Sequence, residues 1–257
     1  WALKEMAVNP ANPTRGMDPI QGAVLLHDGD DGRLLAVVNA PALTAIRTAA
    51  VTAVATRALA RPDARSVAII GAGVQGRAHI DAMRAILPDA EIRVWSRTFA
   101  RAEALATATR CRAVATIADA ARNADIVCTV TASSEPVTQR AWFAPGCHIN
   151  AVGSSTALTR EIDGTTYAQA SLFVDRREST VGESGDYLFA LKEGAIAGPE
   201  HIRAELGDVL IGAHPGRTSA GELTLYKSLG LAIQDLVAAE VAVANARAGG
   251  IGVECDW

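Results

Sequence analysis

The chain has 257 residues, of which 49% are hydrophobic and 20% are charged, and its formal net charge is -4 at pH 7. This length can bury a substantial core, as one large domain or two small ones. The negative charge and the lack of a Lys/Arg-rich block argue against nucleic-acid binding. No apolar run approaches the ~20 residues that span a bilayer. We therefore expect neither nucleic acid nor a membrane as a partner.

The four cysteines, Cys111, Cys128, Cys147 and Cys255, form no CxxC pair and have no histidine at ligand spacing. This pattern favours reduced thiols in a cytoplasmic protein and predicts no metal site. The N-terminal stretch WALKEMAVNP has no signal-peptide layout, which agrees with a cytoplasmic location.

Two apolar runs around an Asp-Gly-rich turn predict a β-hairpin over residues 23–38, because Asp and Gly tolerate the backbone angles of tight turns. The Ala-rich stretch 41–60 follows, and Pro41 near its start favours a helix. A last long helix is expected over roughly residues 228–248, where it stops at a Gly pair.

Between these elements, strand and helix patterns alternate. The expected strands are VAII (67–70), IRVW (92–95), IVCTV (126–130), HINAV (148–152) and LFVD (172–175). Helical patterns near 75–87, 99–108 and 117–123 separate the first three strands. Such alternation predicts an α/β fold with a doubly wound parallel sheet and helices on both faces.

The first of these strands leads into a glycine-rich segment, GAGVQG. Gly71 allows a tight turn, Gly73 lets the backbone approach a pyrophosphate, and Gly76 lets the next helix pack closely. The free N–H groups at the start of that helix then face the phosphates. Because the glycines lie between a strand and an amphipathic helix, they predict a dinucleotide site. Its residues are Gly71, Ala72, Gly73, Val74, Gln75 and Gly76.

The end of the second strand indicates the type of dinucleotide. An NAD site usually carries Asp or Glu there, about 20 residues on, to bind the ribose 2′-hydroxyl. This chain has Ser96, Arg97 and Thr98 instead, with Arg101 one turn further. A carboxylate would repel a 2′-phosphate, whereas Arg binds it with a forked, charge-assisted contact. We therefore expect NADPH as the cofactor, with NADH as the other possibility.

Longer segments are more specific than the glycine pattern. They are LTAIRTAAVTAVATRALARPDARSVAIIGAGVQGRAHIDAM, HINAVGSS, REID, ESGDYL and LYKSLGLAIQDLVAA, in this order. Through them the chain, from about Lys4 to about Ala248, resembles the ornithine cyclodeaminase/mu-crystallin family. The resemblance implies a Rossmann domain over residues 61–217. It also implies a smaller dimerisation and substrate domain, built from residues 1–60 and 218–257, and a homodimer.

The family divides by reaction, and one position bears on which reaction is catalysed. Cyclodeaminase and alanine dehydrogenase members have a catalytic Asp after the fourth Rossmann strand, where this chain has Ser155. A hydroxyl cannot serve as a carboxylate base near neutral pH. The ketimine reductases of the family also have Ser there, followed by a run like REID. The resemblance therefore implies NAD(P)H-dependent reduction of Δ1-pyrroline-2-carboxylate and/or Δ1-piperideine-2-carboxylate, to L-proline or L-pipecolate.

The same resemblance implies roles for single residues. Arg47 is expected to hold the substrate carboxylate by a bidentate contact, and Lys4 to hold it or relay a proton. Ser155 is expected to orient the imine or the nicotinamide amide, and Glu183 matches an acidic residue beside the ligand. For all four, an ordinary surface or turn role stays open. By carry-over from the family, the residues that line the nicotinamide side are Thr131, Val152 and Ser228.

The chain departs from the family pattern in one respect. Family members usually carry a further segment ahead of the Lys4 position, with another carboxylate-binding arginine, and without it the small domain would be incomplete.

Alternative functions also remain open. Among enzymes, the alternative is an ornithine cyclodeaminase or an amino-acid (alanine) dehydrogenase. Outside enzymes, the alternatives are a non-catalytic, crystallin-like NADPH-binding protein and a structural α/β domain.

Overall fold

The computed structural model describes residues 1–9 and 11–255, apart from the Pro13 side chain. It contains two compact units. The terminal unit comprises Trp1–Thr48 and Leu231–Trp257, and the central unit comprises Ala49–Gly230. The sequence-based boundaries lie elsewhere, after residues 60 and 217, and residues 256 and 257 of the expected small domain lie outside the described residues.

The terminal unit contains a three-stranded antiparallel sheet in the order β1-β2-β3. Its strands are β1 (Ala2–Val8), β2 (Ile20–His27) and β3 (Leu34–Asn39). The pairing of β2 with β3 confirms the predicted hairpin, and Gly32 in its turn has a φ of +78°. The unit also holds the 3-10 turn η1 (Asn12–Arg15), the first part of α1 (Ala40–Leu59) and α9 (Ala232–Gly249). Its core contains Val24, Leu26, Ala40, Leu43 and Ala239.

Helix α9 begins later than the sequence predicts. Residues 228–231 are not helical, because Gly230 has a left-handed φ of +91°. The buried Asp175 carboxylate also accepts the N–H groups of Leu229 and Gly230, at 2.7 and 2.5 Å. The end of α9 agrees with the prediction, since Gly250 caps it with a φ of 61°.

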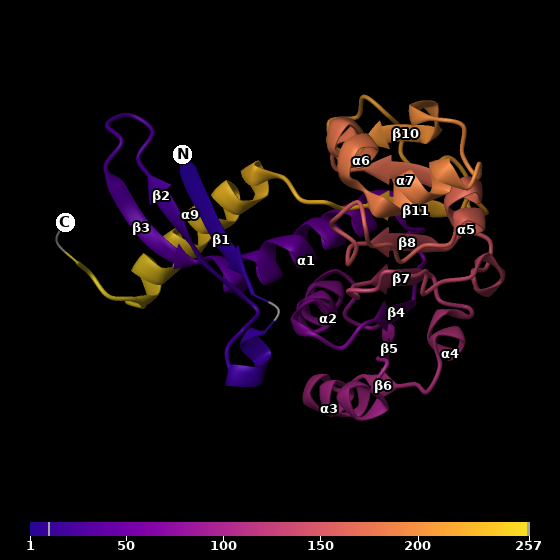
Figure 1. Cartoon of the computed structure of the whole chain (residues 1–257), viewed down its shortest axis with the longest axis horizontal. Coiled ribbons are helices and arrows are strands. Elements are labelled where there is room, and N and C mark those ends of the chain that lie inside the picture. Colours follow the sequence, from indigo (N-terminus) through magenta and orange to yellow (C-terminus); the bar gives the residue numbers. More distant parts are fainter. Residues whose placement is uncertain (10, 256–257) are drawn as a thin grey trace. The chain divides into compact units, whose positions relative to one another are not determined.

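The central unit is built on an eight-stranded parallel sheet in the order β10-β9-β11-β8-β7-β4-β5-β6 (Figure 1). The strands are β4 (Ser66–Ile70), β5 (Glu91–Trp95), β6 (Arg112–Ala113), β7 (Ile126–Thr129), β8 (His148–Ala151), β9 (Ser171–Val174), β10 (Ile202–Glu205) and β11 (Thr224–Lys227). The five predicted strands are confirmed as β4, β5, β7, β8 and β9. The sequence reasoning missed β6, β10 and β11.

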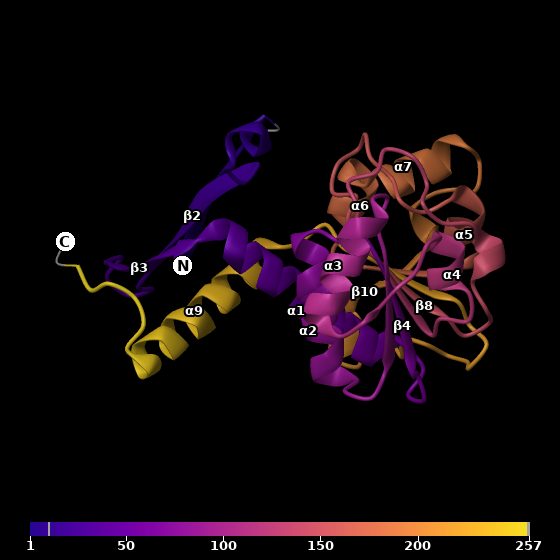
Figure 2. The same cartoon turned by 90° about the horizontal axis from the view of Figure 1, so that it is seen from below.

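Helices lie on both faces of this sheet, as predicted. In Figure 2, α2 and α3 lie on one side of the strands, and α4, α5 and α7 lie on the other. The helices and 3-10 turns of the unit are α2 (Val74–Ile86), α3 (Phe99–Thr109), α4 (Ile117–Ala121), η2 (Arg140–Trp142), α5 (Gly164–Gln169), α6 (Arg177–Glu183), α7 (Gly185–Lys192), η3 (Pro199–His201) and α8 (Leu206–Leu210), together with the last part of α1.

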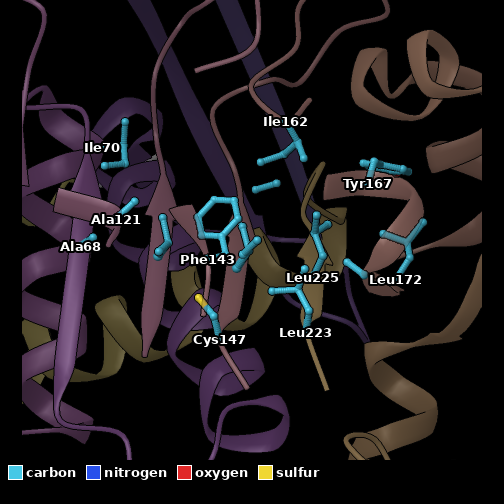
Figure 3. Packing of buried hydrophobic residues seen from close by; sticks show 14 of the residues in the cluster. Ala68, Ile70, Ala121, Phe143, Cys147, Ile162, Tyr167, Leu172, Leu223 and Leu225 are labelled. Carbon is cyan, nitrogen blue, oxygen red and sulfur yellow. The ribbon is translucent and has the colours of Figure 1, made fainter. Parts of the chain in front are cut away.

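The core follows the two-residue alternation of the strands. Ala68 and Ile70 of β4 belong to a buried cluster with Ala121 of α4 and Tyr167 of α5 (Figure 3). Their neighbours in β4, among them Val67, belong to a second cluster with residues of α2 and α3. Both faces of β4 are therefore buried, which explains its continuous apolar run.

The glycines of the first loop allow close backbone packing. Gly71 has a φ of +130°, and a Cβ there would lie 2.8 Å from the Val130 carbonyl oxygen. A Cβ at Gly76 would lie 2.1 Å from the Gly71 carbonyl oxygen. Helix α2 can therefore begin against the turn only while residue 76 has no side chain.

We expect Gly76→Ala to lower the free energy of unfolding by about 2 kcal/mol or more, because the added methyl meets rigid backbone. Urea denaturation measures this change. The matched control is Gly182→Ala in α6, where a Cβ would meet nothing within 4 Å. That variant should be neutral or more stable by up to about 1 kcal/mol. A Gly76→Ala protein as stable as the parent would contradict this account of the turn.

Candidate functional site

The glycine loop forms a cradle at the carboxyl end of β4. A Cβ at Gly73 would meet nothing within 4 Å, so the backbone there borders open space. Gly73 is also the N-cap residue of α2, so the first N–H groups of the helix lie next to it. A helix N-terminus beside an open, side-chain-free backbone fits the pyrophosphate of a dinucleotide.

The position of α2 is held by His79, which is buried in the helix. Its Nδ1 donates to the Gln75 carbonyl oxygen at 2.8 Å, because a carbonyl oxygen can only accept. Its Nε2 lies 3.1 Å from the hydroxyl of Thr52 in α1. Burial lowers the pKa of His79 to about 4, so the ring is neutral at pH 7 and accepts from Thr52.

Ser96, Arg97 and Thr98 directly follow β5, which lies beside β4 in the sheet. Arg97 and Arg101 are exposed, and neither side chain makes a hydrogen bond or ion pair within the described part of the chain. Two unneutralised guanidinium groups one turn apart are suited to an additional phosphate.

The residues expected on the nicotinamide side follow strands on the opposite side of β4. Thr131 comes after β7, Val152 directly follows β8, and Ser228 directly follows β11. The sheet order places all three ends on the same carboxyl edge as the glycine loop. Open parallel sheets bind ligands at this edge, at the point where strand order reverses, here between β4 and β7.

A buried ionic network that the sequence reasoning missed lies under this edge. Lys227 and Asp186 form an ion pair at 2.9 Å between Nζ and Oδ2, and both side chains are fully buried. Asp186 Oδ1 accepts the N–H groups of Glu161 and Ile162, at 2.8 and 2.9 Å. Lys227 Nζ also donates to the Ser154 carbonyl oxygen. The signal was present, because these charged residues lie inside the otherwise specific segments REID, ESGDYL and LYKSLG.

In the terminal unit the structure brings Lys4 and Arg47 together on one carboxylate. Asp235 Oδ1 accepts from Lys4 Nζ at 2.8 Å and from Arg47 Nε at 3.3 Å. Lys4 Nζ also donates to the Thr44 hydroxyl at 2.6 Å, and Arg47 Nη1 donates to Gln234 Oε1 at 2.9 Å. The side chains of Lys4, Arg47 and Asp235 are 19%, 12% and 9% exposed.

The other two predicted catalytic residues, Ser155 and Glu183, belong to the central unit. Both are exposed, and neither side chain has a hydrogen bond or ion pair to the residues that the structure describes. Their backbone segments contact each other, since Gly185 N donates to the Thr156 carbonyl oxygen at 3.1 Å. A Cβ at Gly185 would lie 1.9 Å from the Thr159 carbonyl oxygen, so this approach requires glycine.

Among residues 1–9 and 11–255, no group of three or more His, Cys, Asp or Glu side chains is arranged to hold a metal ion. In the same residues, no helix combines the length and apolar character needed to cross a membrane.

A parallel sheet with a glycine turn before a helix N-terminus, at the point where strand order reverses, defines a Rossmann-type dinucleotide-binding protein. The model of the ornithine cyclodeaminase/mu-crystallin family matches residues 1–250. The chain belongs to this family, and the resemblance seen in the sequence is confirmed.

Named relatives agree with this assignment. A ketimine reductase mu-crystallin of Mus musculus is 40% identical over 223 residues, which cover 86% of this chain and 68% of that protein. The structure of a Thermococcus litoralis Δ1-pyrroline-2-carboxylate reductase with NADH and L-proline is 34% identical, with a TM-score of 0.91 over 99% of this chain and 80% of that one. An archaeal alanine dehydrogenase dimer with bound NAD is 30% identical, with a TM-score of 0.92 over 100% of this chain and 80% of that one.

We expect the chain to bind NADPH at least about tenfold more tightly than NADH, because a charge-assisted contact contributes roughly 1.5–3 kcal/mol. Arg97→Ala should narrow this ratio, as measured by fluorescence titration with both dinucleotides. The matched control is Arg122→Ala, an exposed arginine just after α4 at the opposite, amino edge of the sheet. Equal affinities of the parent for NADPH and NADH would refute the role of Arg97.

Proposed function

We propose that the chain is an NAD(P)H-dependent reductase of cyclic ketimines. Its expected substrates are Δ1-pyrroline-2-carboxylate and/or Δ1-piperideine-2-carboxylate, reduced to L-proline or L-pipecolate. The Mus musculus ketimine reductase mu-crystallin and the Thermococcus litoralis Δ1-pyrroline-2-carboxylate reductase among its relatives support this reaction class.

The observation that carries the proposal is the charge of the cluster around Asp235. Two cations share one carboxylate, so the largely buried cluster retains one net positive charge. Such a charge is costly unless a further anion neutralises it. A substrate carboxylate is suited to this position, since Arg binds carboxylates with two parallel hydrogen bonds.

Ser155 favours a reductase over a cyclodeaminase or an alanine dehydrogenase. It stands where the resemblance places the catalytic Asp of those two enzymes, and its hydroxyl makes no hydrogen bond to the described residues that would activate it. Reduction of an imine does not require a carboxylate base, because a protonated imine accepts hydride without a strong base.

A bound reduced nicotinamide would supply the hydride for this reaction. The glycine loop and α2 would hold the pyrophosphate, and Arg97 with Arg101 would bind a 2′-phosphate. Thr131, Val152 and Ser228 would border the nicotinamide side. These roles fit the open backbone at Gly73 and the free guanidinium groups after β5.

The chain's own residues would then orient and protonate the substrate. Arg47 would hold the carboxylate, and its hydrogen bonds to Asp235 and Gln234 restrict its position. An ammonium group has three N–H donors, and Lys4 uses two of them on Asp235 and Thr44. The third is left to bind the carboxylate or to deliver the proton that balances hydride addition. We expect Ser155 and Glu183 to help orient the ring.

We also propose that the chain forms a homodimer through the terminal unit. Ile233, Val237 and Val241 recur every four residues on α9 and are 56%, 50% and 54% exposed. An apolar stripe of this spacing on a solvent-facing helix is typical of an interface. The alanine dehydrogenase with a similar fold is a dimer. The cytoplasmic location expected from the cysteine pattern stays a prediction.

The test of the proposed reaction is NADPH oxidation in the presence of either cyclic imine. We expect Arg47→Ala to cut kcat/KM by a factor of about 30 or more, since losing one member of a buried charged pair costs about 2–5 kcal/mol. Cofactor affinity should barely change. Arg47→Lys should restore only part of the activity, because a point charge cannot reproduce the fork.

The matched control is Arg57→Ala, which removes an exposed arginine from the same helix. An active parent whose Arg47→Ala variant is equally active would show that the substrate is held elsewhere. A parent that binds NADPH but reduces neither imine would support the non-catalytic binding protein. Ammonia release from ornithine or alanine with NAD would support the cyclodeaminase or dehydrogenase instead.

We expect Val237→Asp to shift the chain from dimer to monomer, because a desolvated carboxylate at an apolar interface is strongly unfavourable. Sedimentation velocity measures the change. Glu103→Gln, at an exposed position on α3 of the central unit, is the control and should leave the dimer intact. A monomeric parent, or a dimeric Val237→Asp variant, would count against this interface.

A further inference from the structure

Glu161 is a fully buried acid that the proposed reaction leaves without a role. Its Oε1 accepts from the Thr131 N–H at 2.6 Å and from the Thr131 hydroxyl at 2.7 Å. Its Oε2 accepts from the Gly153 N–H at 2.7 Å and from the Thr129 hydroxyl at 2.8 Å. One carboxylate therefore joins the loops that follow the neighbouring strands β7 and β8.

The packing around this carboxylate leaves no room for adjustment. A Cβ at Gly153 would lie 2.1 Å from the Thr131 carbonyl oxygen and 2.6 Å from Glu161 Oε1. The two loops thus approach as closely as backbone allows, with the carboxylate between them. Any shift of Glu161 would move both loops.

The hydrogen bonds indicate that Glu161 is ionised. Each oxygen faces a backbone N–H, which can only donate, together with a hydroxyl. The pKa of Glu161 is raised from its ordinary value by burial and by the neighbouring Asp186 carboxylate, although the Lys227 ammonium and the hydrogen bonds from Thr131 lower it in part. Four donors on one carboxylate stabilise the charged form against the desolvation.

The network as a whole carries one uncompensated negative charge. Its members are two carboxylates, Glu161 and Asp186, and one ammonium, Lys227. All three side chains are fully buried, so solvent screens this charge weakly. The cluster of Lys4, Arg47 and Asp235 in the terminal unit instead has one excess positive charge.

The sheet order indicates which end of a dinucleotide this charge faces. Arg97 follows β5 on one side of β4, whereas Thr131 and Gly153 follow β7 and β8 on the other side. In Rossmann folds the dinucleotide lies across the end of the first strand, which is β4 here, with its two nucleotides on opposite sides of that strand. With the adenosine phosphate at Arg97, the nicotinamide end belongs to the β7 and β8 side.

We propose that Glu161 is a positioning residue that holds the Thr131 and Gly153 loops at the nicotinamide end of the dinucleotide and supplies negative charge there. The oxidised nicotinamide ring is then bound more favourably than it would be beside a neutral residue. The nicotinamide ring is cationic when oxidised and neutral when reduced, so a fixed negative charge acts on the two forms differently. This inference rests on the proposed dinucleotide binding.

The experiment compares the Kd of NADP+ with the Kd of NADPH by fluorescence titration, for the parent and for Glu161→Gln. We expect the ratio of Kd for the oxidised form to Kd for the reduced form to rise by about fivefold or more in Glu161→Gln. The matched control is Glu193→Gln, which neutralises an acid that is half-exposed and paired with Arg160. It should leave the ratio unchanged.

A second variant, Asp186→Asn, neutralises the same network at its other carboxylate and should shift the ratio in the same direction. It decides the question if Glu161→Gln does not fold, as judged by circular dichroism. An unchanged ratio in the folded variants, or equal weakening of both forms, would overturn the inference, as would failure of both variants to fold. A parent that binds neither dinucleotide would instead refute the proposed function.

Discussion

The hydrogen bonds to the Glu161 carboxylate are the interaction on which the carboxyl edge of the sheet depends. Loops that leave parallel strands have lost their ladder partners, and a buried N–H without an acceptor costs about 1–3 kcal/mol. Glu161 accepts the N–H of Thr131 and the N–H of Gly153 with one side chain, and the Gly153 N–H also donates to the Thr129 carbonyl oxygen at 3.1 Å. Burying a carboxylate is itself costly, by several kcal/mol. Here four donors offset that cost, and the Lys227–Asp186 pair holds the Glu161 backbone through its N–H. The edge therefore keeps its shape because polar groups in its interior are mutually satisfied.

Charge balance separates residues that support the fold from residues that are available to ligands. Asp125 accepts from Arg61, Ser66 and two backbone amides, so its charge is used within the protein. Arg97 has no such partner among the described residues, although it directly follows a core strand. Lys4 and Arg47 share a single carboxylate and retain a positive excess. Uncompensated charges at the end of a strand and in a nearly closed cluster are hard to explain by stability, which is why both point to anionic ligands.

The sequence was sufficient for the parts of the fold that depend on local pattern. The runs that form β4 and β7 are largely apolar on both faces, so their burial could be predicted from composition alone. Strand β8 is apolar on one face only, because His148 and Asn150 are buried on the other. Strand β6 has only two residues, Arg112 and Ala113, and β11 contains Lys227, whose burial depends on Asp186 from a distant segment. The start of α9 was predicted too early because the Asp175 carboxylate, far away in sequence, holds Leu229 and Gly230 out of the helix. For the candidate site, motifs led to Lys4, Arg47 and the glycine loop. The same segments contain Asp235 and Glu161, but their roles could not be predicted, because these roles follow from the partners that the fold brings to them.

The division of the sheet edge into a dinucleotide side and a substrate side explains how one fold can support several reactions in this family. The glycine loop, α2 and the end of β5 concern only the dinucleotide, and they lie on the β4 and β5 side of the sheet. Ser155, the position that we propose distinguishes a ketimine reductase from a cyclodeaminase, follows β8 on the other side. Exchanging Ser for Asp at an exposed loop position alters no buried contact of the sheet, since the Ser155 side chain makes no hydrogen bond or ion pair with any described residue. The fold therefore accounts for where a dinucleotide can bind, whereas the choice of substrate depends on a few side chains that local sequence can change independently.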